Sequence, residues 1–222
     1  MGPFTEQHSS AELANAAQNK TSCGTVFQIT PTGKLTTVYS FCSQPGCRDG
    51  LEPVSGVIQA EDGNFYGTTM IGGGPGCLSD AGCGTVYQLT PAGVLTTLHS
   101  FDKTDGEDPV AALLQGTNGV FYGETLYGGT SEYGTVFGVN TGLGPFVAFV
   151  RGAAKAEQQF GILGQGFTGT TAVSLNGTPA SFTVKSDTFI LATVPAGATT
   201  GYVTVTTPSG TLTSNKPFVV IP

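Results

Sequence analysis

Short segments in which apolar and polar residues alternate recur along the chain, with glycine-rich turns between them. Gly84–Thr90 is the clearest example, and its alternation is typical of a β-strand. Before it, Val57–Ala60 and Phe65–Thr69 are separated by an Asp-Gly pair that favours a tight hairpin turn. After it, Val94–Phe101 follows the turn Thr90–Gly93, which has Pro91 at its second position. Together these segments predict one antiparallel unit of four strands, the content of a β-propeller blade.

The same unit returns elsewhere in the chain. Gly24–Phe27 recurs as Gly84–Tyr87 and again as Gly134–Phe137, and Asp62–Gly67 recurs as Asn118–Gly123. A period of about 50 residues indicates one supersecondary unit that is used repeatedly. We therefore expect an all-β fold that begins with blade-like, four-stranded repeats.

The repeats are too few to close a ring by themselves. Residues 24–41 supply the last two strands of a unit, 51–101 supply all of them, and 110–139 supply the first three. That is about two blades, whereas propellers have at least about four. Open sheet edges favour association, which leaves three alternatives. Copies of the chain could assemble, so that three would form a ring of about six blades; the chain could be a piece of a longer array; or the units could pack face to face. The first two are favoured.

A different pattern begins at Leu143. Asn176–Gly177 predicts a hairpin between Ala172–Leu175 and Ala180–Val184. Further strands are predicted at Phe189–Val194, Gly201–Thr206 and Pro217–Ile221. Turns at roughly ten-residue spacing are typical of an immunoglobulin-like β-sandwich. The stretch from Arg151 to Gln159 departs from this regularity.

Three regions are therefore expected. Residues 1–20 are expected to form a leader outside the fold, which contains His8 and a candidate short helix at 10–18. Residues 21–142 form the repeat domain, and residues 143–222 form the immunoglobulin-like domain. The start has neither the basic segment nor the apolar segment of a signal peptide.

The composition limits the classes of partner that can be expected. Charged residues make up 10% of the chain, the net charge is -7, and there are 8 Lys and Arg. Because binding to phosphate needs a basic patch, a nucleic-acid partner is not expected. No run of about 18 apolar residues occurs, so membrane insertion is not expected either. A small-molecule or glycan ligand suits an acidic, Thr-rich surface.

Four of the 5 cysteines stand in close pairs. Cys42 and Cys47 flank one loop and Cys77 and Cys83 flank another, which favours two small disulfide rings. A metal site is the alternative, but the spacing is not that of a zinc ribbon. Cys23 stands where Cys83 stands in the next copy, and no cysteine occurs near position 17, where its partner is expected. This gap and the missing signal peptide suggest that the natural start is absent, and disulfides favour an extracellular or periplasmic location.

The segments GTVFQITPTGKLTTVYSFCSQPGCRDG and DGNFYGTT closely resemble the Gloeo/Verruco (GloVer) repeat, over residues 21 to about 140. This resemblance implies an exported bacterial protein and supplies no catalytic residues. The G-Q-G-F, N-G-T-P-A and S-D-T segments resemble an IPT/TIG domain, over about residues 145–222. That resemblance implies a spacer or adhesion module.

Standard catalytic motifs are missing from the sequence. Its 2 histidines, His8 and His99, do not suggest a hydrolytic triad. The four acids of one loop, Asp102, Asp105, Glu107 and Asp108, are a candidate calcium site, with an acidic solvated turn as the alternative. Glu124 replaces the Thr of the earlier repeat inside a strand, and Glu132 lies nearby in sequence.

Two functions follow from these residues. The first is a non-catalytic, secreted module that binds a surface or a glycan. The alternative is a calcium-dependent hydrolase that opens a lactone or ester with Glu124 and Glu132 in place of a triad, by analogy with propeller lactonases. Composition and the missing nucleophile favour the module.

Overall fold

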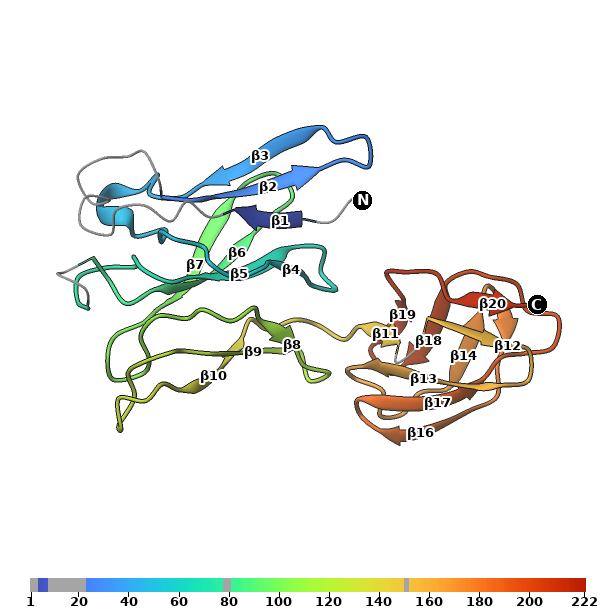
Figure 1. Ribbon diagram of the computed structural model, residues 1–222. Coiled ribbons are helices and arrows are strands. Elements are labelled where there is room, and N and C mark those ends of the chain that lie inside the picture. The colour runs from blue at the N-terminus through green and yellow to red at the C-terminus, as the bar shows by residue number, and fades with distance from the viewer. Residues whose placement is uncertain (1–3, 8–22, 78–80, 150–151) are drawn as a thin grey trace. The chain divides into compact units, whose positions relative to one another are not determined.

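The computed structural model describes residues 4–7, 23–77, 81–149 and 152–222 and shows an all-β protein (Figure 1). Within these residues the helical structure is one short 3-10 turn, Pro45–Cys47. The chain divides into two compact units. We call residues 1–115 and 121–139 the repeat unit, and residues 116–120 and 140–222 the C-terminal unit.

The repeat unit contains three antiparallel sheets, none of which closes into a barrel. The first sheet consists of β1 (Phe4–Gln7), β2 (Thr25–Ile29) and β3 (Leu35–Ser40). The second consists of β4 (Ile58–Gln59), β5 (Phe65–Thr69), β6 (Thr85–Leu89) and β7 (Leu95–Ser100). The third consists of β8 (Leu114–Gln115), β9 (Val120–Glu124) and β10 (Val136–Asn140). These strands confirm the segments that the repeat pattern predicts.

Strand pairing follows the sequence repeat residue by residue. Thr25 lies opposite Ser40 in the first sheet, and Thr85 lies opposite Ser100 in the second. Both hairpins have the same register irregularity, directly after Val26 and directly after Val86. The repeated sequence therefore produces the same strand pairing in both sheets, including the register shift within each hairpin.

β1 is a strand that the pattern did not predict. Thr5 lies opposite Phe27, as Gly67 lies opposite Tyr87, so β1 takes the place in the first sheet that β5 takes in the second. These residues belong to the predicted leader at 1–20. The rest of that leader, with His8 and the helical stretch at 10–18, lies outside the described residues.

Aromatic side chains join each sheet to the next. The rings of Phe41 and Tyr87 are 5.2 Å apart, and the corresponding pair, Phe101 and Phe137, is 5.0 Å apart. Both pairs meet edge to face, which is a favourable geometry for aromatic rings. Tyr66 also stacks on Phe121 of the third sheet at 4.1 Å. The core of the repeat unit is therefore built from contacts between successive sheets.

The C-terminal unit contains two four-stranded sheets around one core. One has the order β11–β13–β17–β16, built from Val147–Phe149, Gln159–Gly164, Phe189–Thr193 and Phe182–Ser186. The other has the order β15–β14–β18–β19, built from Thr178–Pro179, Ala172–Leu175, Val203–Thr207 and Gly210–Thr213. A third, parallel pair joins β12 (Ala153–Lys155) to β20 (Val219–Ile221). Both four-stranded sheets contribute to one core, whose largest side chains include Phe160, Ile162, Phe167, Leu175, Ile190 and Phe218.

The predicted hairpin at Asn176–Gly177 is correct in its turn and wrong in its second strand. Asn176 and Gly177 have φ values of 47° and 81°, as a two-residue hairpin turn requires. However, β14 pairs with the two-residue β15, and Ala180–Val184 leads into β16, which pairs with β17 in the other sheet. Ala180 still donates its N–H to the carbonyl of Val173 at 2.9 Å, and from Phe182 onward the chain pairs with β17 instead.

The G-Q-G-F and S-D-T segments, which resemble those of an IPT/TIG domain, lie against each other. The Phe167 N–H donates to the carbonyl of Asp187 at 3.0 Å. The Asp187 carboxylate accepts from the hydroxyl and N–H of Thr168, at 2.7 and 3.0 Å, and from the N–H of Gly166 at 3.2 Å. These bonds, those from Thr168 above all, hold the pKa of Asp187 below its usual value.

Candidate functional site

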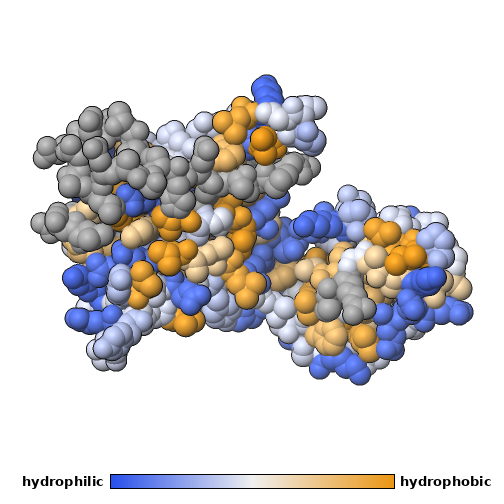
Figure 2. Space-filling model, viewed as in Figure 1, coloured by the Kyte–Doolittle hydropathy of each residue, from blue (hydrophilic) through white to orange (hydrophobic). Residues whose placement is uncertain are grey.

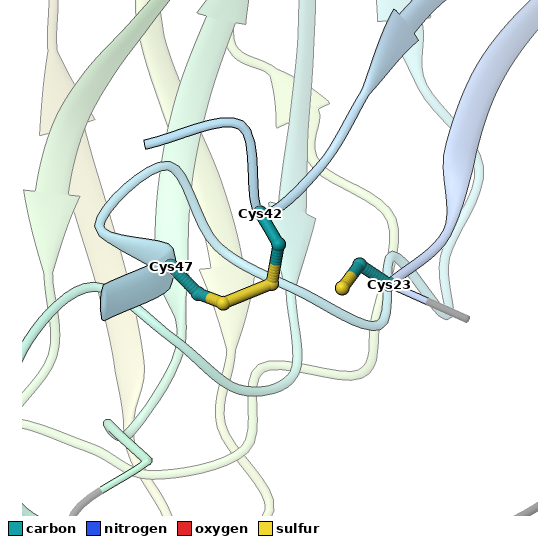
Figure 3. Close-up of side chains that lie close together, drawn as sticks. All are labelled: Cys23, Cys42 and Cys47. Carbon is teal, nitrogen blue, oxygen red and sulfur yellow. A yellow bond between two sulfur atoms is a disulfide. The ribbon is translucent and has the colours of Figure 1, made fainter. Parts of the chain in front are cut away.

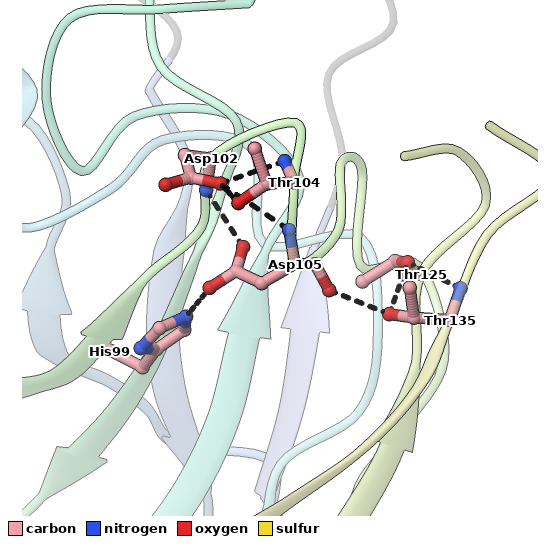
Figure 4. Close-up of polar contacts among 6 residues, drawn as sticks. All are labelled: His99, Asp102, Thr104, Asp105, Thr125 and Thr135. Carbon is pink, nitrogen blue, oxygen red and sulfur yellow. Dashed lines mark hydrogen bonds and ion pairs between the residues drawn. The ribbon is translucent and has the colours of Figure 1, made fainter. Parts of the chain in front are cut away.

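The acidic loop at 102–108 is closed by its own hydrogen bonds (Figure 4). Asp102 accepts from the N–H and the hydroxyl of Thr104, at 2.7 and 2.5 Å. Asp105 accepts from the N–H of Asp102 at 2.9 Å and lies 2.7 Å from Nε2 of His99. The hydrogen bonds from Thr104 are the largest cause of a pKa of Asp102 below its usual value. Two of the four acids thus hold the loop together.

The loop does not gather its carboxylates around one point. Glu107 lies 3.9 Å from Nζ of Lys103, and Asp108 is buried. Among the described residues, one group of three candidate metal ligands lies within 4.8 Å, and it consists of cysteines. The structure therefore does not bring Asp102, Asp105, Glu107 and Asp108 together, and a calcium site there stays a prediction.

Asp108, the last acid of the loop, lies in a buried environment. It is 5% exposed, and its Oδ1 has no hydrogen-bond partner. Burial is the largest cause that raises its pKa to about 6, and the charges of Glu107 and Glu52 add to it. A carboxyl group that titrates near neutral pH can exchange protons under physiological conditions.

The raised pKa predicts how Asp108→Asn changes stability with pH. Because the folded pKa lies above the unfolded one, the stabilising proton is fully bound below about pH 4 and lost as the pH rises through about 6. At pH 8 we expect the Asn variant to be more stable than the wild type by about 1–2 kcal/mol, after allowance for solvent screening. At pH 4 this gain should disappear.

Urea unfolding of both proteins between pH 4 and 8 measures this difference. Asp102→Asn is the control, because the pKa of Asp102 is shifted downward and its replacement should not stabilise the protein at pH 8. An equal free-energy difference between Asp108→Asn and wild type at every pH would contradict the assignment.

Glu124 and Glu132 are both exposed to solvent. Glu124 lies near the end of β9, where its counterpart Thr68 is 0% exposed and contacts Ser55 through their hydroxyls at 3.0 Å. Glu132 has a positive φ of 59° in the following loop. Their proposed catalytic role stays a prediction from the sequence.

The cysteines form the two disulfides that their spacing predicts, Cys42–Cys47 and Cys77–Cys83. Cys23 is buried, and its sulfur lies within 4.8 Å of those of Cys42 and Cys47 (Figure 3). The position near residue 17, where the repeat places a partner for Cys23, lies outside the described residues. Since Cys42 and Cys47 are bonded to each other, this sulfur group does not present three thiolates.

A groove of about 500 Å³ lies in the C-terminal unit, along β12, β13 and β17. Its polar lining comes from the exposed amides of Gln158 and Gln159, and its apolar lining includes the half-buried Phe189 and Leu191. Gly161 also lines the groove and lies opposite Leu191 in the sheet. The Oε1 atom of Gln158 accepts from the N–H of Lys155 at 3.2 Å, which orients this amide.

Sequence reasoning missed both Asp108 as a buried acid and this groove. The sequence shows Asp108 only as one member of an acidic loop, because its burial depends on residues far away in sequence. The sequence carries one sign of the groove, since Gln158 and Gln159 end the irregular stretch that departs from the strand pattern.

The described residues include no helix long and apolar enough to cross a membrane.

Comparison with known proteins gives one match along most of the chain. The sequence profile described as the Gloeobacter/Verrucomicrobia repeat matches residues 11–206. No curated protein matches. The match reaches past residue 142, where the sequence pattern changes.

Two solved structures are distantly similar. One is SGBP-B from a complex xyloglucan utilization locus in Bacteroides uniformis, with 14% identity and a TM-score of 0.31 over 75% of this chain and 46% of that one. The other is a fungal alcohol oxidase of the AA5 family in complex with copper, with 13% identity and a TM-score of 0.36 over 89% of this chain and 48% of that one. The chain spans about half the length of each, and both scores are too low to establish a shared fold.

Proposed function

The chain belongs to the Gloeobacter/Verrucomicrobia repeat family, and from this premise we propose that it is a non-catalytic extracellular module that binds a glycan. The groove along β13 and β17 is the observation that carries this proposal. The two disulfides support an oxidising location outside the cytoplasm. In this proposal the repeat sheets are blade-like units, and the C-terminal unit is an IPT/TIG-type, immunoglobulin-like sandwich.

The chemistry of the groove suits a sugar ring. Gln158 and Gln159 offer amide groups that both donate and accept hydrogen bonds, as hydroxyl groups need. Phe189 and Leu191 offer an apolar surface for the C–H face of the ring. An uncharged lining favours neutral polysaccharides over acidic ones.

Native gels that contain a soluble neutral polysaccharide provide the test. We expect at least one of a panel of glucans, mannans and galactans to retard the wild-type protein. The double variant Gln158→Ala/Gln159→Ala should bind about 5- to 150-fold more weakly, because each lost hydrogen bond costs ~0.5–1.5 kcal/mol.

Gln59→Ala is the matched control. Gln59 is also exposed on a strand, β4, but it lies in the repeat unit. This variant should be retarded as the wild type is. A double groove variant that binds as tightly as the wild type, or a panel in which no polysaccharide retards the protein, would refute the proposal.

A further inference from the structure

Each repeat sheet has an outer face, which holds Val26, Val86 or Val136, and an inner face, which holds Phe27, Tyr87 or Phe137. The outer face of the third sheet is exposed, whereas the outer faces of the two earlier sheets are covered. Val26 and Val86 are 0% exposed, and Val136, which occupies the same place in the repeat, is 82% exposed. Tyr66 is 0% exposed, and its counterpart Tyr122 is 38% exposed. We call Tyr122, Tyr133 and Val136 the terminal face.

A third repeat position shows the same change. Cys23 is 7% exposed and Cys83 is 1% exposed, whereas Tyr133, at the corresponding place, is 92% exposed. Apolar side chains reach the surface of the repeat unit in Figure 2 as well. Tyr122 and Val136 lie on β9 and β10, Tyr133 lies in the loop before β10, and Glu124, at the place of Thr68, is the charged residue of this face. Large apolar side chains that are exposed together mark an interaction surface.

The earlier sheets show what covers this face. Val26 belongs to one buried cluster with Phe65, Tyr87 and Leu89, which come from the second sheet. Tyr66, on the second sheet, is covered by Phe121 of the third. In both cases the occupant is the inner face of the next repeat.

The first sheet offers such an inner face. Phe27 and Ile29 occupy the places of Tyr87 and Leu89 in the pairing of the strands. Tyr87 and Leu89 are 0% exposed, whereas Phe27 and Ile29 are only half-buried. The side chains that would cover a terminal face are therefore present at the other end of the repeat unit.

We propose that copies of this chain associate head to tail, with Phe27 and Ile29 of one copy packed on Tyr122 and Val136 of another. The contact continues the interface that already joins successive sheets. It is heterologous, so it produces rings if the rotation closes and open chains if it does not. β10 is an edge strand of its sheet, and an uncovered edge also favours association.

Sedimentation velocity over a range of concentrations tests the association. The wild type is expected to form species larger than the 22.6 kDa monomer. Val136→Lys should weaken association more than about tenfold, because the ammonium group would be buried in an apolar contact. Val94→Lys is the matched control, since Val94 is 61% exposed directly before β7 in the second sheet, and it should associate as the wild type does.

A mixing experiment distinguishes the two ends. Val136→Lys and Ile29→Lys each block one end and should be monomeric alone, but an equal mixture should form a dimer through the two intact ends. Phe27→Lys replaces Ile29→Lys if that variant fails to fold, as judged by circular dichroism. A monomeric wild type at every concentration, or a mixture that stays monomeric, would overturn the proposal. Groove binding by the C-terminal unit would be unaffected by either result.

Discussion

Tyr66→Ala is expected to lower the free energy of unfolding of the repeat unit by about 3–5 kcal/mol, the range for truncation of a large buried aromatic side chain. Tyr66 is 0% exposed and stacks on Phe121 at 4.1 Å. Its hydroxyl also donates to Asp62 and accepts from Nε2 of Gln88, both at 2.8 Å. The substitution therefore removes a contact between sheets and one hydrogen bond each from Asp62 and Gln88, although Asp62 keeps its bonds from Asn64.

Tyr122→Ala is the matched control for this prediction. Tyr122 occupies the same place in the next repeat but is 38% exposed. Its replacement should cost about 1 kcal/mol or less, as is usual for surface positions. Equal losses for the two variants would contradict the view that contact with the next sheet stabilises each repeat.

Tyrosine fluorescence is a suitable probe for these measurements. The protein has no tryptophan and 7 tyrosines, of which Tyr202 is the one in the C-terminal unit. The signal therefore reports mainly on the repeat unit. Unfolding should be followed in urea at low protein concentration, so that association through the terminal face does not contribute.

The strands of the repeat unit could be predicted because their determinants are local. Phe65–Thr69 is both the predicted segment and the observed β5, since flanking turns and side-chain alternation fix a strand without reference to distant residues. The close cysteine pairs were predictable for the same reason. Repetition strengthened each of these predictions, because the same pattern occurred more than once.

Long-range contacts were not predictable from these patterns. β16 pairs with β17 and not with β14, and this choice depends on how two sheets share a core. Asp108 looked like its acidic neighbours, although its contacts across the unit bury it. A local pattern identifies a strand or a loop, whereas the partner of a strand and the burial of a charge depend on the whole fold.

The repeat also places one polar pair in two different environments. The Tyr39 hydroxyl donates to Asp49 at 2.8 Å, and His99 lies 2.7 Å from Asp105 at the corresponding place in the next repeat. Asp49 is 0% exposed, whereas the Asp105 side chain is 43% exposed. The same contact is thus buried beside the Cys42–Cys47 ring and solvated in the acidic loop.

Asp49→Ala is therefore expected to destabilise the repeat unit by about 3 kcal/mol or more, and Asp105→Ala by about 1 kcal/mol or less. Asp49 accepts from the hydroxyl and N–H of Ser43, both at 2.9 Å, and from the N–H of Gln44 at 3.2 Å. Burial raises the pKa of the Tyr39 hydroxyl, which keeps it protonated as a donor to Asp49.

Urea unfolding at pH 7 compares these two variants directly. In Asp49→Ala, the half-buried Tyr39 hydroxyl and the donors of Ser43 and Gln44 lose their shared acceptor at once, and the vacated position is fully buried, so several hydrogen bonds to a charged group are lost together. In Asp105→Ala, water replaces the carboxylate as the partner of His99. If Asp105→Ala were the more harmful change, the acidic loop rather than the disulfide-bonded loop would be the structural anchor of its repeat. The larger loss at Asp49 would instead show that burial, and not the repeated contact itself, determines the energetic value of this pair.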